Sequence, residues 1–321
     1  MGLQHLQKLG NYLKLFNKDK PLYVLAPLAG FTDLPFRRVV KKFGADLTVS
    51  EMISSNALVY GSEKTKKMIE KSDNENPYSV QIAGSDEVII KGAVEILNQE
   101  NGIDIIDLNS GCPVPKVIKG GSGSALLKDL KKLEKLTRVI KENSTKSLTS
   151  VKVRIGFDSK YPVEIAKAVE NGGADFITIH GRTRSGGFKS EVDYDAIAEI
   201  KANISIPVIA NGDITDFQKA KFVLNHTKVD GLMIGRGAVG KPWIFHQLKT
   251  GTENIDSDIK KAIILEHFNS MVDFYGERGI ILFRKHLHTY SKGIDGASEF
   301  RNLINFEEDV ENMKSLILKY F

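Results

Sequence analysis

Short apolar and β-branched runs alternate with longer segments of helical periodicity along the first three quarters of the chain. Eight such runs occur, at residues 22–26, 47–50, 79–83, 103–108, 150–155, 176–180, 207–210 and 231–234. Several are apolar at nearly every position, which is typical of strands buried on both faces of a parallel sheet. Helical patterns lie between them, including 87–98, 130–141, 162–171 and 195–201.

Eight strand–helix units predict an α/β fold in which the strands close into a (β/α)₈ TIM barrel. An open, doubly wound sheet is the main alternative. After Pro242 and Trp243 the strand pattern stops, and residues 258–275, 280–293 and 296–319 have helical periodicity. We therefore expect a barrel over residues 1–245 followed by a small, all-helical C-terminal domain over residues 246–321.

Composition narrows the class of protein. The chain has 321 residues, of which 41% are hydrophobic and 26% charged, enough apolar material for a sizeable core. No apolar run reaches the roughly 18 residues of a membrane span, and the N-terminus lacks the pattern of a signal peptide. A single cysteine rules out an intrachain disulfide and agrees with a reducing compartment, so we expect a cytoplasmic protein that is not bound to a membrane.

The positive charge lies on the barrel. The net charge is +5, yet residues 246–321 hold 10 Lys/Arg against 12 Asp/Glu, so the first 245 residues have an excess of seven positive charges. Such an excess is compatible with an anionic partner without requiring one. The sequence leaves the oligomeric state open, with a monomer slightly favoured.

Polar groups follow nearly every predicted strand, at the rim where barrels of this kind carry their active sites. Asn211, Gly212 and Asp213 follow the seventh strand, and Gly235 and Arg236 follow the eighth. Glycine permits close approach of a ligand to the backbone, and an arginine adds a charged donor. Each segment alone is ordinary turn chemistry, but together they favour a phosphate site.

Gln81, Lys152 and Arg154 lie within the third and fifth strands. An amide can bond both a carbonyl and an N–H of a flavin edge, and a lysine near the ring stabilises the anionic reduced form. The alternative is that Lys152 is a solvated strand-end lysine. Because Lys152 and Arg154 share one face of a largely apolar strand, that alternative is weakened.

Cys112 and His180 are candidates for proton transfer. Cys112 lies between Gly111 and Pro113 at the end of the fourth strand, so we favour a chemical role over that of a small buried hydrophobe. A thiol with the ordinary pKa of about 8.5 is mostly protonated near pH 7 and can act as a general acid. His180 could be a ligand group, an acid or a satisfied core residue. The seven histidines show no metal-ligand spacing, so no metal is expected.

These motifs together resemble the tRNA-dihydrouridine synthase family, in particular its bacterial B-type members. The matching segments are APLAGFTDLPFR (26–37), IDLNSGCPVPKV (106–117), GSALL (123–127), VKVRIG (151–156), HGRTR (180–184), PVIANGDI (207–214), MIGRGAVGKPWIF (233–245) and RKHLHTYSKG (284–293). The resemblance covers residues 20 to 305. No single motif is specific to the family, but their joint occurrence in this order is. Leu28 and Ser110 depart from the residues most common in the family.

The resemblance implies reduction of uridine in tRNA to dihydrouridine, with bound FMN and NADPH as the usual hydride donor. It implies FMN contacts at Ala26, Pro27, Leu28, Gln81, Lys152, His180, Asn211, Gly212, Asp213, Gly235 and Arg236. It also implies Cys112 as the proton donor and Asn109 as a group on the uracil. In this interpretation the barrel is the catalytic domain and the helical domain binds tRNA.

Cations are the expected RNA contacts, because they can neutralise phosphates. Arg154 is a candidate at the uracil, and Arg182, Arg184, Arg284, Lys285 and Lys292 are candidates along the RNA. For the last three, a solvated helix face is an equal alternative. Two other functions stay open at this point: an FMN barrel acting on a free pyrimidine, similar to a dihydroorotate dehydrogenase, and a non-catalytic RNA-binding barrel.

Overall fold

The computed structural model describes residues 10, 15–16 and 20–321. Eight parallel strands form its centre: β1 (Leu22–Leu25), β2 (Leu47–Val49), β4 (Tyr78–Ala83), β5 (Ile105–Ser110), β6 (Leu148–Arg154), β7 (Phe176–His180), β8 (Val208–Asn211) and β9 (Gly231–Ile234). Each pairs with its neighbours in chain order, and β1 also pairs with β9. The sheet is therefore closed, which confirms the predicted (β/α)₈ barrel and excludes the open sheet. A two-residue strand, β3 (Ile53–Ser54), extends the pairing of β4.

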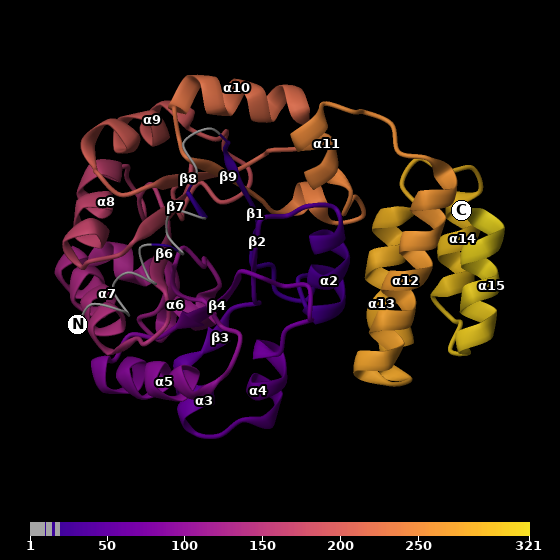
Figure 1. Cartoon of the computed structure of the whole chain (residues 1–321), viewed down its shortest axis with the longest axis horizontal. Coiled ribbons are helices and arrows are strands. Elements are labelled where there is room, and N and C mark those ends of the chain that lie inside the picture. The colour runs from indigo at the N-terminus through magenta and orange to yellow at the C-terminus, as the bar shows by residue number, and fades with distance from the viewer. Residues whose placement is uncertain (1–9, 11–14, 17–19) are drawn as a thin grey trace.

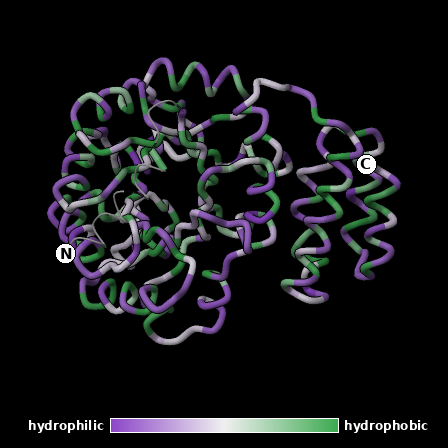
Figure 2. Tube along the Cα trace, viewed as in Figure 1, coloured by the Kyte–Doolittle hydropathy of each residue, from purple (hydrophilic) through white to green (hydrophobic). Residues whose placement is uncertain are grey.

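Helices surround the barrel (Figure 1). They are α2 (Leu34–Lys42), α3 (Ser55–Val59), α4 (Glu63–Ile69), α5 (Glu87–Gln99), α6 (Pro115–Lys119), α7 (Leu130–Asn143), α8 (Pro162–Asn171), α9 (Tyr194–Asn203), α10 (Phe217–Thr227) and α11 (Ile244–Thr250), with 3₁₀ turns η1 (Gly123–Lys128) and η2 (Arg236–Ala238). Polar positions recur along their outer sides (Figure 2). Their apolar stripes bury residues such as Leu133, Leu136 and Ile140 of α7 against the strands.

Four further helices form a bundle beside α2, visible at the opposite end of the molecule from α7 and α8 in Figure 1. They are α12 (Ser257–Tyr275), α13 (Arg278–Tyr290), α14 (Ala297–Ile304) and α15 (Val310–Tyr320). The bundle has its own core, which includes Phe268, Phe283 and Phe300. The prediction of one helix over 296–319 was wrong. The chain turns after Ile304, and the Asp309 side chain accepts a hydrogen bond from Asn312 N and begins a new helix.

The passage from barrel to bundle follows α11. Phe245 and Leu248 belong to the core of the barrel, whereas Trp243 lies in the core of the bundle. The two cores thus share the residues around α11, and the domain boundary between residues 245 and 246 stays a prediction. No helix among the described residues is both long and apolar enough to cross a membrane.

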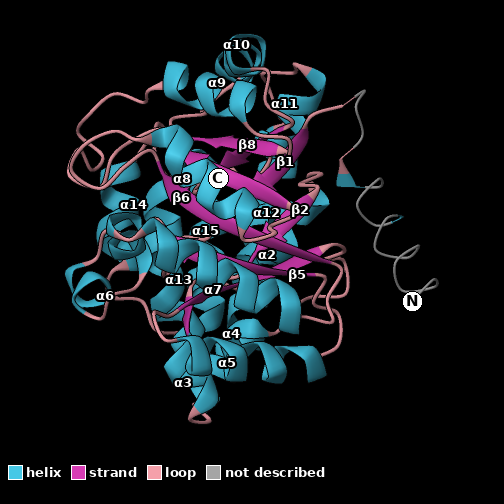
Figure 3. Cartoon of the chain, turned by 90° about the vertical axis from the view of Figure 1, so that its left-hand side faces the viewer, coloured by secondary structure: helices cyan, strands magenta, loops and turns pink. Residues whose placement is uncertain are grey.

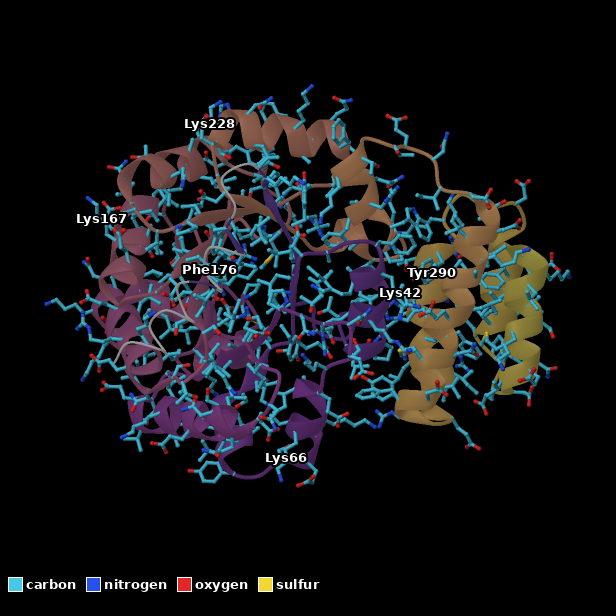
Figure 4. All side chains as sticks on the ribbon, viewed as in Figure 1. Lys42, Lys66, Lys167, Phe176, Lys228 and Tyr290 are labelled. Atoms are coloured by element: carbon cyan, nitrogen blue, oxygen red, sulfur yellow. The ribbon has the colours of Figure 1, made fainter. Side chains whose placement is uncertain are left out.

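The bundle is joined to the barrel mainly through α2, and Figure 4 shows Lys42 and Tyr290 between these two elements. Lys42 Nζ forms an ion pair with Glu266 of α12 at 2.5 Å. Behind it, the rings of His267 and His286 lie against Phe36 with centroid distances of 5.4 Å. A view turned by 90°, with the side of the barrel opposite the bundle facing the viewer, shows the strands running across the molecule (Figure 3). The bundle is therefore held close to one side of the barrel.

Candidate active site

A cavity of about 430 Å³ opens at the carboxyl ends of the barrel strands. Nearly every strand contributes to its lining, as expected from the convergence of parallel strands at one rim. The residues that we predicted to bind a cofactor all lie in this lining: Ala26, Pro27, Leu28, Gln81, Lys152, His180, Asn211, Gly212, Asp213, Gly235 and Arg236. Cys112, Asn109, Arg154 and Arg182 lie there as well. Residues far apart in the sequence are thus brought together at one site.

Four of the predicted substrate contacts lie outside this lining, Lys292 among them. The Arg184 guanidinium stacks over the Phe157 ring at 5.0 Å, outside the cavity lining. Arg284 donates a hydrogen bond to Glu307 O at 2.8 Å and lies 3.8 Å from the Glu308 carboxylate, so it is engaged within the bundle. Lys285 reaches from α13 toward the loop after β1, with its Nζ 5.3 Å from the Phe31 ring.

Cations surround the cavity because β6, β7 and the loop after β9 each deliver them. Lys152 is half-buried and donates to Asn211 Oδ1 at 3.1 Å. Burial, together with the positive charge of Arg154, lowers the pKa of Lys152 to about 8. Arg154 donates to Gly111 O at 2.7 Å and Thr183 O at 3.1 Å, and burial and Arg182 lower its pKa to about 10.

His180 is held neutral. Burial lowers its pKa to about 2, with further contributions from Lys152, Arg154, Arg182 and Arg236. A neutral imidazole can donate and accept hydrogen bonds, but it does not act as an imidazolium acid at neutral pH. Of the three roles considered for His180, this environment favours a neutral hydrogen-bonding group.

Asp213 joins the two loops after β7 and β9. Its carboxylate accepts hydrogen bonds from both terminal nitrogens of Arg182 and from Arg236, the latter at 3.0 Å. These two guanidinium groups keep the pKa of Asp213 below its ordinary value. Gly212, with φ +136°, allows the turn, because a Cβ there would lie 2.8 Å from Val192. The loops therefore present two arginines whose shared counter-ion is one carboxylate.

The Cys112 loop is anchored at both its amide and its carbonyl. Cys112 N donates to Asn109 Oδ1 at 2.9 Å, while Ser124 donates to Cys112 O from its backbone N at 3.0 Å and its hydroxyl at 2.8 Å. The thiol itself is half-buried in the cavity lining. It is thus close to solvent-accessible space and fixed to the end of β5.

Sequence reasoning missed two groups in this region. Phe188, in the loop after β7, lines the cavity, and Arg236 lies 4.4 Å from its ring. An aromatic residue in an irregular loop has no periodicity that could have indicated this position. Asp107 is buried directly beneath the lining and accepts from Gln81 Nε2 at 2.7 Å. Its spacing of two from Asn109 on one strand was a usable signal, because both side chains must share a face.

No group of three or more His, Cys, Asp or Glu side chains in the part of the chain that the structure describes is arranged to hold a metal ion. The polar side chains of the cavity are mostly amides and cations, with one thiol, one imidazole, one hydroxyl and one carboxylate that two arginines neutralise. Such a set suits an anionic, planar and hydrogen-bonding ligand better than a metal ion.

Comparison with known proteins gives a consistent result. The family model described as Dihydrouridine synthase (Dus) matches residues 24–320. A protein of Helicobacter pylori (strain ATCC 700392 / 26695) named Probable tRNA-dihydrouridine synthase is 51% identical over 95% of this chain and 93% of its own length. The tRNA-dihydrouridine synthase B of Vibrio parahaemolyticus is 43% identical over 93% of both chains.

Among solved structures, TcOYE with pHBA aligns with 83% of this chain and 98% of its own at a TM-score of 0.56 and 9% identity. A variant of NCR from Zymomonas mobilis aligns with 77% and 94% at a TM-score of 0.54 and 15% identity. At these identities the two structures show a shared barrel fold and nothing more specific.

Proposed function

Because the chain belongs to the dihydrouridine synthase family, we propose that it reduces the C5=C6 bond of uridine in tRNA to 5,6-dihydrouridine. We propose FMN as the bound cofactor and NADPH as the hydride donor. The single observation that carries this proposal is the arrangement of one cavity, in which one thiol, three side-chain amides and several cations converge. A binding protein without chemistry has no need of that combination.

The lining fits FMN in its chemistry. Arg236 and the backbone around Gly212 and Gly235 would hold the phosphate, because a charged donor and exposed N–H groups meet at these loops. The Gln81 and Asn211 amides offer donors and acceptors for the polar edge of the ring. Lys152 would balance negative charge beside that edge. Ala26, Pro27 and Leu28 would provide apolar contact.

The remaining groups suit the uracil chemistry. When bound and reduced, the flavin supplies the hydride that is added at C6 of the uracil. Negative charge then develops on C5 and the O4 carbonyl, and fixed donors in a water-poor site stabilise such charge most effectively. Arg154, neutral His180 and the remaining N–H of Asn109 are the candidate donors. Cys112 then gives its proton to C5 as a general acid.

RNA must present an unstacked base, because a uracil inside a helix cannot enter a cavity at the end of a barrel. Lys285 extends from the bundle to the loop that follows β1, whose first residues line the cavity. We therefore propose that the bundle and the rim of the barrel bind tRNA together. Arg182 contributes through the shape of the rim rather than as a free cation, since Asp213 occupies its guanidinium.

The test is a reconstituted reaction. Purified protein with FMN and NADPH is incubated with unmodified tRNA, and dihydrouridine is measured by mass spectrometry of the digested RNA. We expect dihydrouridine with the wild-type protein and almost none with Cys112→Ala. Free uridine and dihydroorotate are assayed in parallel. Turnover of dihydroorotate without any modification of tRNA would replace this proposal with that of a dihydroorotate dehydrogenase-like enzyme.

A further inference from the structure

A chain of buried polar side chains runs beneath the cavity across three neighbouring strands. Gln81 of β4, Asp107 of β5 and Ser150 of β6 are register partners. Ser150 Oγ donates to Asp107 Oδ1 at 2.5 Å, and Gln81 Nε2 donates to Asp107 Oδ2 at 2.7 Å. Gln81 Oε1 accepts from Asn109 Nδ2 at 2.7 Å. All four residues are more than nine-tenths buried, so the hydrogen bonds between them are shielded from water.

The chain ends at the backbone of the cysteine loop. Asn109 Oδ1 accepts hydrogen bonds from Gly111 N at 3.1 Å and from Cys112 N at 2.9 Å. These two N–H groups belong to adjacent residues, and both donate to the same oxygen. The amide of Asn109 therefore holds the turn that carries the thiol.

The polarity of this chain is fixed from both ends. A carboxylate only accepts and a backbone N–H only donates, whereas a side-chain amide can present either face. With Asp107 at one end and the amides of Gly111 and Cys112 at the other, only one orientation of Gln81 and Asn109 satisfies every bond. Turning either amide over would set two donors or two acceptors against each other, which is costly in a buried site.

We propose that Asp107 is a positioning residue that fixes the orientation of the Gln81 and Asn109 amides and thereby holds the Cys112 loop at the cavity. It does not touch the thiol. It acts through the two amides, and its influence on tRNA reduction rests on the proposed function. The hydrogen-bonded arrangement itself does not depend on the proposed function.

The charge state of Asp107 is consistent with this role. Burial raises its pKa to about 6, while hydrogen bonds from Ser150 and Gln81 limit the rise. At pH 7.5 the group is mostly ionised and accepts at both oxygens. The arrangement leaves Gln81 with one N–H and one lone pair, and Asn109 with one N–H, for molecules that enter the cavity.

The decisive measurement is hydrogen–deuterium exchange at the backbone amides of Gly111 and Cys112. In Asp107→Leu, Gln81 loses its acceptor and both amides are free to turn. We expect exchange at these two positions to become about tenfold faster, the scale of one lost hydrogen bond. In Asp107→Asn, the Oδ1 atom can still accept from Gln81 while the NH₂ group donates to the Ser150 hydroxyl. We expect exchange within about threefold of wild type.

Ser150→Ala is the matched control, because it removes the other partner of Asp107 and leaves the Gln81 contact in place. It should resemble Asp107→Asn. If Asp107→Leu does not fold, Gln81→Met breaks the same chain one step closer to the loop and should show the fast exchange. Wild-type exchange in Asp107→Leu or Gln81→Met would overturn the proposal. So would Asp107→Asn exchanging as fast as Asp107→Leu, because the negative charge, rather than an acceptor, would then be required.

A second readout links the loop to chemistry. Single-turnover oxidation of the reduced protein by tRNA, measured with FMN bound to saturation, should slow about tenfold in Asp107→Leu and recover in Asp107→Asn. Exchange is measured without substrate, so it tests Asp107 even if the wild-type protein fails to reduce tRNA. That failure would refute the proposed function alone.

Discussion

Cys112 is the residue on which the proposed chemistry depends most directly. Cys112→Ala should leave FMN binding and its reduction by NADPH intact, because the thiol holds no other side chain in place. It should slow tRNA reduction by about 10²-fold or more, the usual scale for loss of a general acid. Cys112→Ser should stay slow, since a hydroxyl is a much weaker acid. A near wild-type single-turnover rate in Cys112→Ala would remove the thiol from the mechanism.

Lys152 predicts how cofactor binding depends on pH. Its pKa in the cavity is lowered to about 8, chiefly by burial. A bound anion raises that pKa, so binding is favoured while Lys152 is protonated and weakens as pH rises above 8, by at most about tenfold per unit. The dissociation constant of FMN, followed by fluorescence, should be flat between pH 6.5 and 7.5 and rise between pH 8 and 9.5. Lys152→Gln should bind more weakly at pH 7 and lose this rise.

The two loops after β8 and β9 act as one element through Asp213. Arg236→Ala should weaken FMN binding by about tenfold to a hundredfold, because it removes a charge-assisted contact and leaves Asp213 neutralised by Arg182 alone. Arg184→Ala is the matched control, since that guanidinium stacks on Phe157 away from the cavity. Titration of the apoprotein with FMN measures both variants. Equal affinities in the two would place the phosphate elsewhere.

Most elements could be predicted from the sequence because barrel strands carry a strong local signal. Apolar runs buried on both faces mark the strands, and their order in the chain fixes their order in the barrel. The break between α14 and α15 could not be predicted, because helical periodicity continues on both sides of residues 305–309. It depends on packing and on the Asp309 cap.

At the candidate site, sequence reasoning identified residues but not their partners. The groups at the ends of the strands were recognisable, since topology alone brings them to one rim. That Asp213 is shared by two arginines depends on the conformations of two loops. That Arg284 is engaged by Glu307 depends on the turn after α14. Such contacts are set by tertiary structure, which no local pattern encodes.

For the whole molecule, the bundle should strengthen binding of tRNA without affecting the flavin. Lys285→Ala combined with Lys292→Ala should raise KM for tRNA and flatten its dependence on salt, because each phosphate contact contributes to that slope. NADPH oxidation should not change. Lys167→Ala, on the outer side of α8 far from the bundle (Figure 4), is the control for a lost surface charge. Unchanged tRNA kinetics in the double variant would mean that Lys285 and Lys292 belong to a solvated helix face.

The junction between bundle and barrel should respond to acid. His286 is fully buried, and burial, with His267 and Lys285, holds its pKa well below 6.5. Below pH 6.5 the unfolded chain binds a proton there that the folded protein does not, so the free energy of unfolding falls as pH falls. Both ring nitrogens lack a partner among the described residues. His286→Phe should therefore be tolerated at pH 7.

The size of this effect can be measured by urea unfolding at two pH values. Between pH 7 and pH 5.5, the wild-type protein should lose about 1 kcal/mol more stability than His286→Phe, the contribution of one histidine. An identical loss in both proteins would mean that His286 takes up its proton in the folded state.

The crowding of cations around one carboxylate has a consequence for the thermal stability of the protein. Lys152, Arg154, Arg182 and Arg236 all line the cavity, and Asp213 is the one carboxylate among the described lining residues. Like charges held this close repel one another, so the folded state carries a penalty that an anion in the cavity relieves. Ligand that binds only the folded state adds stability in proportion to the logarithm of its free concentration. The melting temperature of a preparation should therefore rise with the fraction of the protein that holds an anionic ligand.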